Sequence, residues 1–117
     1  MSQITVYVAG PISLGDQFAN CGRAIAFGHE LHLRGFVPYV PHWGALQQLH
    51  AAWSPQEWLD YDFVWLDKCE VLFRLAGESV GSDKEVERAK EDRKAIFYEQ
   101  VDGLNLLEQY KKMKLGR

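Results

Sequence analysis

Two carboxylates stand in contexts that could support chemistry, and the first is Glu85. It ends the run Ser82-Asp83-Lys84-Glu85, in which a serine is followed three positions later by a glutamate. This spacing is typical of a capping box, so a structural role at a helix start is one interpretation. The same helix start would stabilise the ionised carboxyl group and could direct it into a cleft. Glu85 is therefore a candidate nucleophile, with helix capping as the alternative.

The second carboxylate is Asp62. It follows Trp58 by four positions and precedes Trp65 by three, so both indoles would share its side of a helix. A carboxyl group between aromatic rings has a raised pKa, as a general acid requires. The alternative is a solvated surface aspartate.

Arg74 interrupts an apolar run near its carboxyl end. Its guanidinium group would either extend to solvent at the sheet margin or reach a cleft and bind an anion. His42 and Trp43 could line a pocket, with structural packing as the alternative. His29 and His32 are one helical turn apart, but nothing completes a metal-binding pattern, so we expect no metal site.

Two segments rich in glycine and hydroxyl residues, 10–15 and 77–82, each precede or begin an expected helix. Helix N-termini offer free N–H groups and a partial positive charge, which suit a phosphate. Neither segment contains a Walker A or GxGxxG pattern. The spacing alone therefore does not decide between phosphate binding and an ordinary turn.

The elements that would position these residues alternate between strand and helix. This order predicts one α/β domain over residues 1–117, with a parallel sheet of about four to five strands and helices on both faces. Pro38 indicates an edge strand, and Ser54-Pro55-Gln56-Glu57 is a strong helix start. The expected strands are 4–8, 36–40, 71–75 and 95–98, and the expected helices are about 16–34, 54–68, 82–93 and 104–115, with a short helix within 41–53.

The overall composition narrows the function classes. A formal charge of −3 gives no basic footprint for a nucleic acid polymer. No apolar stretch approaches the ~20 residues of a membrane span, so we expect no membrane partner. Two cysteines do not make a disulfide framework. We therefore expect a cytoplasmic protein that binds a small molecule.

Three motifs follow one another along the chain. They are Tyr7-Val8-Ala9-Gly10-Pro11-Ile12-Ser13, Asp62 in Asp-x-x-Trp-Leu, and Ser79-x-Gly81-Ser82-x-x-Glu85. In this order they resemble the nucleoside 2-deoxyribosyltransferase superfamily, and most closely its nucleotide N-glycosidase branch and short phage-type relatives. The likeness covers about residues 4 to 98, and it implies a small Rossmann- or flavodoxin-like domain.

The resemblance implies a role for each motif. The glutamate matching Glu85 attacks the anomeric carbon, the tyrosine matching Tyr7 orients it, and the aspartate matching Asp62 is a candidate proton donor. The 5′-phosphate would be bound by the first loop and by the segment around the helix start, and Arg74 is a further candidate anion ligand. The expected phosphate-binding residues are Gly10, Pro11, Ile12, Ser13, Ser79, Gly81, Ser82 and Arg74.

Two departures from the family pattern stand out. The loop Ser13-Leu14-Gly15 lacks the arginine that some nucleotide-specific relatives carry, and the helix after Glu85 is unusually charged. The serines nevertheless favour hydrolysis of a nucleoside 5′-monophosphate, with no cofactor. The alternatives are base exchange between nucleosides and a non-catalytic nucleotide-binding module.

The resemblance also implies a homodimer or higher homo-oligomer, because family members commonly share the pocket between subunits. An apolar stripe on the closing helix is one candidate interface, and cover for the core is the alternative. Its members are Leu104, Leu107 and Tyr110, with Leu106 beside them.

Overall fold

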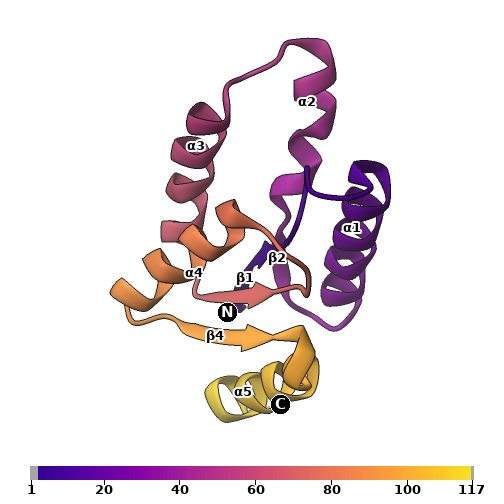
Figure 1. The fold of residues 1–117 in the computed structure, drawn as a ribbon. Coiled ribbons are helices and arrows are strands. Elements are labelled where there is room, and N and C mark those ends of the chain that lie inside the picture. The colour runs from indigo at the N-terminus through magenta and orange to yellow at the C-terminus, as the bar shows by residue number, and fades with distance from the viewer. Residues whose placement is uncertain (1–2, 117) are drawn as a thin grey trace.

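A computed structural model describes residues 3–116, in which strands and helices alternate along the chain (Figure 1). No helix in that range is both long and apolar enough to span a membrane. The elements are β1 (Thr5–Ala9), α1 (Gln17–Leu33), β2 (Val37–Tyr39), the 3-10 helix η1 (Pro41–Gly44), α2 (Ala45–His50), α3 (Pro55–Lys68), β3 (Val71–Arg74), α4 (Val80–Glu91), β4 (Ala95–Tyr98), the 3-10 helix η2 (Glu99–Val101) and α5 (Gly103–Leu115).

The four strands form one sheet in the order β2-β1-β3-β4, and every neighbouring pair is parallel. The predicted α/β class is therefore confirmed. Pro38 lies on the edge strand β2, as its missing N–H requires. The chain moves outward from β1 in one direction and from β3 in the other, so the loops after these two central strands diverge. Such a reversal of strand order is where open α/β sheets bind ligands.

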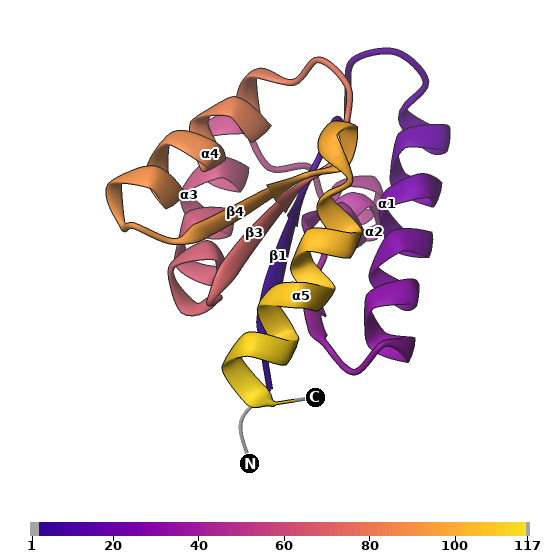
Figure 2. The same cartoon turned by 90° about the horizontal axis from the view of Figure 1, so that it is seen from below.

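Helices cover both faces of the sheet, α1 and α5 on one side and α3 and α4 on the other (Figure 2). The side chains of β1 contribute to a hydrophobic core on each face of the sheet, because successive side chains of a strand point to opposite faces. Val6 and Val8 pack in the core with Leu31 and Leu107, from α1 and α5. Tyr7 is fully buried in the other core, under α3 and α4.

The apolar stripe of α5 is occupied by this packing. Leu107 is buried, while Leu104 and Tyr110 pack against the same core. The interpretation of the stripe as cover for the sheet is therefore correct, and this face is not free to bind another subunit. Leu106 remains partly exposed beside it.

Helix α4 begins earlier than the sequence predicted. Val80 is its first residue, and the Ser79 hydroxyl caps it by accepting from the Ser82 N–H at 3.1 Å. The predicted capping box from Ser82 to Glu85 is therefore wrong, since Ser82 already lies in the first turn and Glu85 in the second. The capping box of α3 is confirmed, with Ser54 and Glu57 bonded reciprocally.

Two glycines of α1 give a matched test of the packing. A Cβ on Gly28 would lie 2.6 Å from the buried Val40 Cγ2, whereas a Cβ on Gly22 would meet nothing within 4 Å. Gly28→Ala should lower the free energy of unfolding by about 1–3 kcal/mol through overpacking. Gly22→Ala should raise it by about 0.5–1 kcal/mol, because alanine favours a helix interior. Urea denaturation measures both, and equal effects of the two substitutions would contradict this packing.

Candidate active site

A cavity of about 690 Å³ lies at the reversal of strand order, where the loops after β1 and β3 diverge. Its walls come from the loop after β1, η1, α2, α3 and the first turns of α4. Both candidate carboxylates, Glu85 and Asp62, line it. The topology thus brings together side chains that are 23 positions apart in the sequence.

Glu85 is buried on α4, with only 6% of its surface exposed. The Tyr7 hydroxyl, from the middle of β1, donates a short hydrogen bond to Glu85 Oε2. Burial raises the pKa of Glu85 to about 8, although the bond from Tyr7 favours the ionised form. Burial also raises the pKa of Tyr7 well above its ordinary value, so the phenol remains a donor. Tyr7 does not line the cavity; it holds Glu85 from within the core.

Asp62 faces the same cavity from α3 and is 7% exposed, so the interpretation as a solvated surface aspartate is wrong. Burial raises its pKa to about 7. Its Oδ1 atom is buried without a hydrogen-bond partner. Of the two indoles expected around it, Trp58 lines the cavity, whereas Trp65 stacks on Tyr39 with ring centroids 5.5 Å apart.

The two carboxyl groups interact, because each ionised group makes ionisation of its neighbour harder. The charge of Asp62 adds to the raised pKa of Glu85. Such a pair loses its protons in two steps that belong to both groups. Near neutral pH the pair can hold one proton and one negative charge, and the higher pKa of Glu85 places the proton mostly on that residue. The opposite arrangement, with Glu85 ionised and Asp62 protonated, is the one in which a nucleophile and a general acid would stand side by side.

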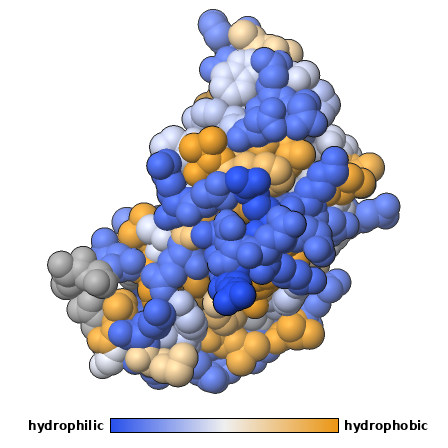
Figure 3. All heavy atoms as spheres, turned by 90° about the vertical axis from the view of Figure 1, so that its left-hand side faces the viewer, coloured by the Kyte–Doolittle hydropathy of each residue, from blue (hydrophilic) through white to orange (hydrophobic). Residues whose placement is uncertain are grey.

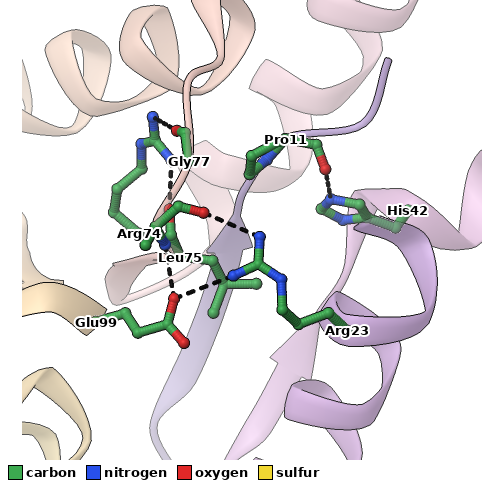
Figure 4. A network of polar contacts seen from close by, with 8 residues as sticks. Pro11, Arg23, His42, Arg74, Leu75, Gly77 and Glu99 are labelled. Atoms are coloured by element: carbon green, nitrogen blue, oxygen red, sulfur yellow. Dashed lines mark hydrogen bonds and ion pairs between the residues drawn. The ribbon is translucent and has the colours of Figure 1, made fainter. Parts of the chain in front are cut away.

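Most of the predicted phosphate-binding residues lie around the cavity. The start of α4 places its backbone N–H groups there, beside the loop that follows β1. Pro11 is the exception in that loop, since its carbonyl oxygen instead lies 3.1 Å from His42 Nε2 (Figure 4). The residues that line the cavity are Gly10, Ile12, Ser13, Ser79, Gly81 and Ser82.

Arg74 does not line the cavity, and the structure gives it another task. Its guanidinium group donates to the Leu75 carbonyl and, at 2.9 Å, to the Gly77 carbonyl (Figure 4). It also pairs with Asp83 at 3.2 Å. Arg74 therefore stabilises the loop between β3 and α4 through contacts with three protein oxygens.

Sequence reasoning missed most of the wall opposite α4. Trp53 lines the cavity and packs on Trp58 with ring centroids 4.3 Å apart. Gln48 joins them, accepting from the Trp53 N–H at 3.0 Å and from Trp58 Nε1 at 2.5 Å. The tryptophan-rich segment 43–65 was the available signal. Of the two residues weighed for this region, His42 lines the cavity and Trp43 does not.

Within residues 3–116, no group of three or more His, Cys, Asp or Glu side chains could hold a metal ion. His29 and His32 stack on α1 with ring centroids 6.4 Å apart. No protein-family model matches the sequence, and no curated protein matches it significantly. The assignment of a function therefore depends on the site itself and on the motifs that carry the resemblance.

The buried carboxyl group makes a prediction about stability. The unfolded chain ionises Glu85 near its ordinary pKa of 4.5, whereas the folded chain keeps the proton to about pH 8. Its contribution to stability is thus full below pH 4.5 and is lost as pH rises to 8. Glu85→Gln, which mimics the protonated form, should match wild type at pH 5 and exceed its free energy of unfolding by about 1–3 kcal/mol at pH 8.

The matched control is Asp92→Asn, which replaces an exposed carboxyl group at the end of the same helix. It should leave the difference between pH 5 and pH 8 as in wild type. Urea denaturation at the two pH values measures the effect. A Glu85→Gln protein with the wild-type pH dependence would show that Glu85 is ionised in the folded state.

Proposed function

We propose that this protein hydrolyses the N-glycosidic bond of a nucleoside 5′-monophosphate, with Glu85 as nucleophile. The observation that carries the proposal is the buried Glu85, held by Tyr7 and facing a cavity that it shares with Asp62. Burying two carboxyl groups costs stability, which is typical of functional sites. The resemblance of the three sequence motifs to N-glycosidases supports the same reaction.

The cavity suits the two ends of such a substrate. Its volume of about 690 Å³ lies within the range of small-molecule sites. Trp53 and Trp58 form an aromatic wall on which a base can stack. The N-terminus of α4 and the Ser79 hydroxyl favour a phosphate, because helix starts attract anions.

The proposed reaction is a double displacement. A Glu85 oxygen forms a bond to C1′ while the bond from C1′ to the base nitrogen breaks, and Asp62 gives its proton to that nitrogen. Asp62, now ionised, takes a proton from water as the water oxygen attacks C1′. The bond between C1′ and Glu85 breaks in the same step, which releases the sugar 5-phosphate and restores both carboxyl groups. Tyr7 orients Glu85 throughout.

Base exchange and simple nucleotide binding are the competing functions. Incubation with a panel of nucleosides and nucleoside 5′-monophosphates, followed by chromatography, separates all three. Hydrolysis releases free base from the monophosphate without any added acceptor base. Release that requires an added acceptor base would indicate exchange, and binding without release would indicate a sensing or sequestering protein.

Glu85→Gln should lower kcat by at least ~10³-fold, because an amide oxygen is a poor nucleophile. The fold should persist, since the amide can still accept the hydrogen bond from Tyr7. Asp92→Asn, at the exposed end of the same helix and outside both cavities, is the matched control and should retain wild-type turnover. Base release at the wild-type rate by a folded Glu85→Gln protein would rule out this mechanism.

The pH profile should be narrow. The reactive form has Glu85 ionised and Asp62 protonated, which is the less populated of the two singly protonated forms because Asp62 has the lower pKa. We therefore expect kcat/KM to peak between about pH 7 and about pH 8 and to fall on both sides. Asp62→Asn should cost about 10²–10⁴-fold and abolish the alkaline limb. Initial rates between pH 5.5 and 9.5 measure both effects. An alkaline limb that persists in Asp62→Asn would assign the proton to another group.

We also propose that the protein is a homo-oligomer. A second hollow of about 460 Å³ lies between α3 and α4, with Leu59, Phe63 and Val80 among its lining residues. Figure 3 shows the apolar surface on this side of the molecule, bordered by hydrophilic residues. Leu59 and Val80 line the active-site cavity as well, so a partner bound there would adjoin the site. Charges of both signs around the hollow allow symmetric pairing.

Light scattering at micromolar concentration should therefore return a multiple of 13.4 kDa. Val80→Arg should dissociate the oligomer, because it would place a charge in the interface. The control is Val101→Arg, since Val101 is equally exposed but lies on η2. A wild-type monomer that is fully active at nanomolar concentration would defeat the proposal.

A cytoplasmic location is part of the same proposal. Cys21 and Cys69 are both free and buried thiols. Unpaired thiols persist where the surroundings are reducing, and nucleoside monophosphates are intracellular metabolites.

A further inference from the structure

The loop between β3 and α4 is held by two arginines that lie outside the cavity. Arg23, from α1, donates through Nη2 to one loop carbonyl at 2.9 Å. Arg74, from β3, donates to the carbonyls on either side of it, one of them also at 2.9 Å (Figure 4). Three consecutive carbonyl oxygens, those of Leu75, Ala76 and Gly77, are thus bound to cationic side chains.

Glu99, from η2, contacts both Arg23 and the backbone of the same loop. Its Oε1 accepts from the Ala76 N–H at 2.7 Å and pairs with Arg23 Nη1 at 3.3 Å (Figure 4). Arg23 and Glu99 therefore bind both backbone groups of Ala76 and each other. Gly77 follows with φ +122°, where any Cβ would lie 2.6 Å from Pro11 Cγ, so the loop is also packed against its counterpart after β1.

This arrangement holds residues 75–77, which lead directly into the cavity-lining residues Glu78 and Ser79 and the start of α4. The first N–H groups of a helix have no partner within the helix. In α4 the Ser79 hydroxyl accepts a hydrogen bond from the N–H group of Ser82 and from no other of these groups. The N–H groups of Val80 and Gly81 thus remain at the cavity, while the carbonyl oxygens before them are bound by arginines. An anion gains from the N–H groups and avoids repulsion by carbonyl oxygens.

Two residues that line the same cavity carry buried polar atoms without hydrogen-bond partners. His42 is 2% exposed, and its Nδ1 atom has no hydrogen-bond partner. The Oδ1 atom of Asp62 lacks a partner as well. Buried polar atoms without partners cost free energy, which a bound polar ligand would recover.

We propose that Arg23 and Glu99 are positioning residues for phosphate recognition, and this inference rests on the proposed function. Neither residue lines the cavity, so neither would contact the substrate. They fix the orientation of the Ala76 peptide groups and thereby keep the N–H groups at the start of α4 directed at the 5′-phosphate. Without them the loop can rotate and offer a carbonyl oxygen to the anion, which weakens binding.

The test compares Arg23→Ala with Arg34→Ala. Arg34 lies at the end of the same helix with a similarly exposed side chain, and pairs with Glu30 and Glu108 away from the loop. Arg23→Ala should raise KM for the 5′-monophosphate about tenfold, with kcat within about twofold. It should leave cleavage of the unphosphorylated nucleoside unchanged. Arg34→Ala should behave as wild type, and Arg23→Lys should restore part of the loss.

Calorimetric titration with ribose 5-phosphate provides a readout that does not need catalysis. Its Kd should rise about tenfold in Arg23→Ala, and Glu99→Gln should add little in the double variant, because the two residues act as a unit. An unchanged Kd, or equal losses with phosphorylated and unphosphorylated substrates, would overturn the inference.

The same experiment separates this inference from the proposed function. If no substrate is cleaved but ribose 5-phosphate binds wild type more tightly than Arg23→Ala, the positioning role stands and the proposed reaction falls. If free base is released while wild type binds no ribose 5-phosphate, the reaction stands and the positioning role falls.

Discussion

The hydrogen bond from the Tyr7 hydroxyl to Glu85 joins the central strand to helix α4 inside the protein. A buried carboxyl group without such a donor would be costly in either protonation state. The bond fixes the orientation of Glu85, and burial raises its pKa to about 8. It also ties the site to the fold, because Glu85 lies in the second turn of α4 and Tyr7 in the middle of β1. One contact thus orients the carboxyl group in the cavity and joins α4 to the sheet.

The strand order explains why the other polar groups gather at the same place. Because β1 and β3 are neighbours and the chain turns away from both, their loops open between α1, α3 and α4. One loop brings Gly10 to Ser13, the other brings the start of α4, and α3 adds Asp62 from the side. Trp53 and Trp58 form the opposite wall. A cavity with a helix N-terminus, a carboxylate pair and an aromatic wall follows from this topology.

The fold could be predicted from the sequence largely because each element has a local signal: apolar β-rich runs, the cap at Ser54 and the proline of β2. The N-cap of α4 lies three positions before the predicted one, because Ser79 and Ser82 are both suitable cap residues and the local sequence does not distinguish them. The burial of Asp62 could not be decided from spacing, since an amphipathic pattern does not say how deep one side chain lies. Arg74 was assigned to a ligand because its loop carbonyl partners arise only in the folded chain.

The most direct test of the account is the covalent intermediate itself. A 2′-fluorinated nucleoside 5′-monophosphate slows both steps, because the electron-withdrawing fluorine destabilises the oxocarbenium-like transition state. Wild type should gain the mass of one fluorinated sugar phosphate, and peptide mapping should place it on Glu85, with no adduct in Glu85→Gln. An adduct on another residue, or release of free base from the natural substrate by a folded Glu85→Gln protein, would contradict the central role of Glu85.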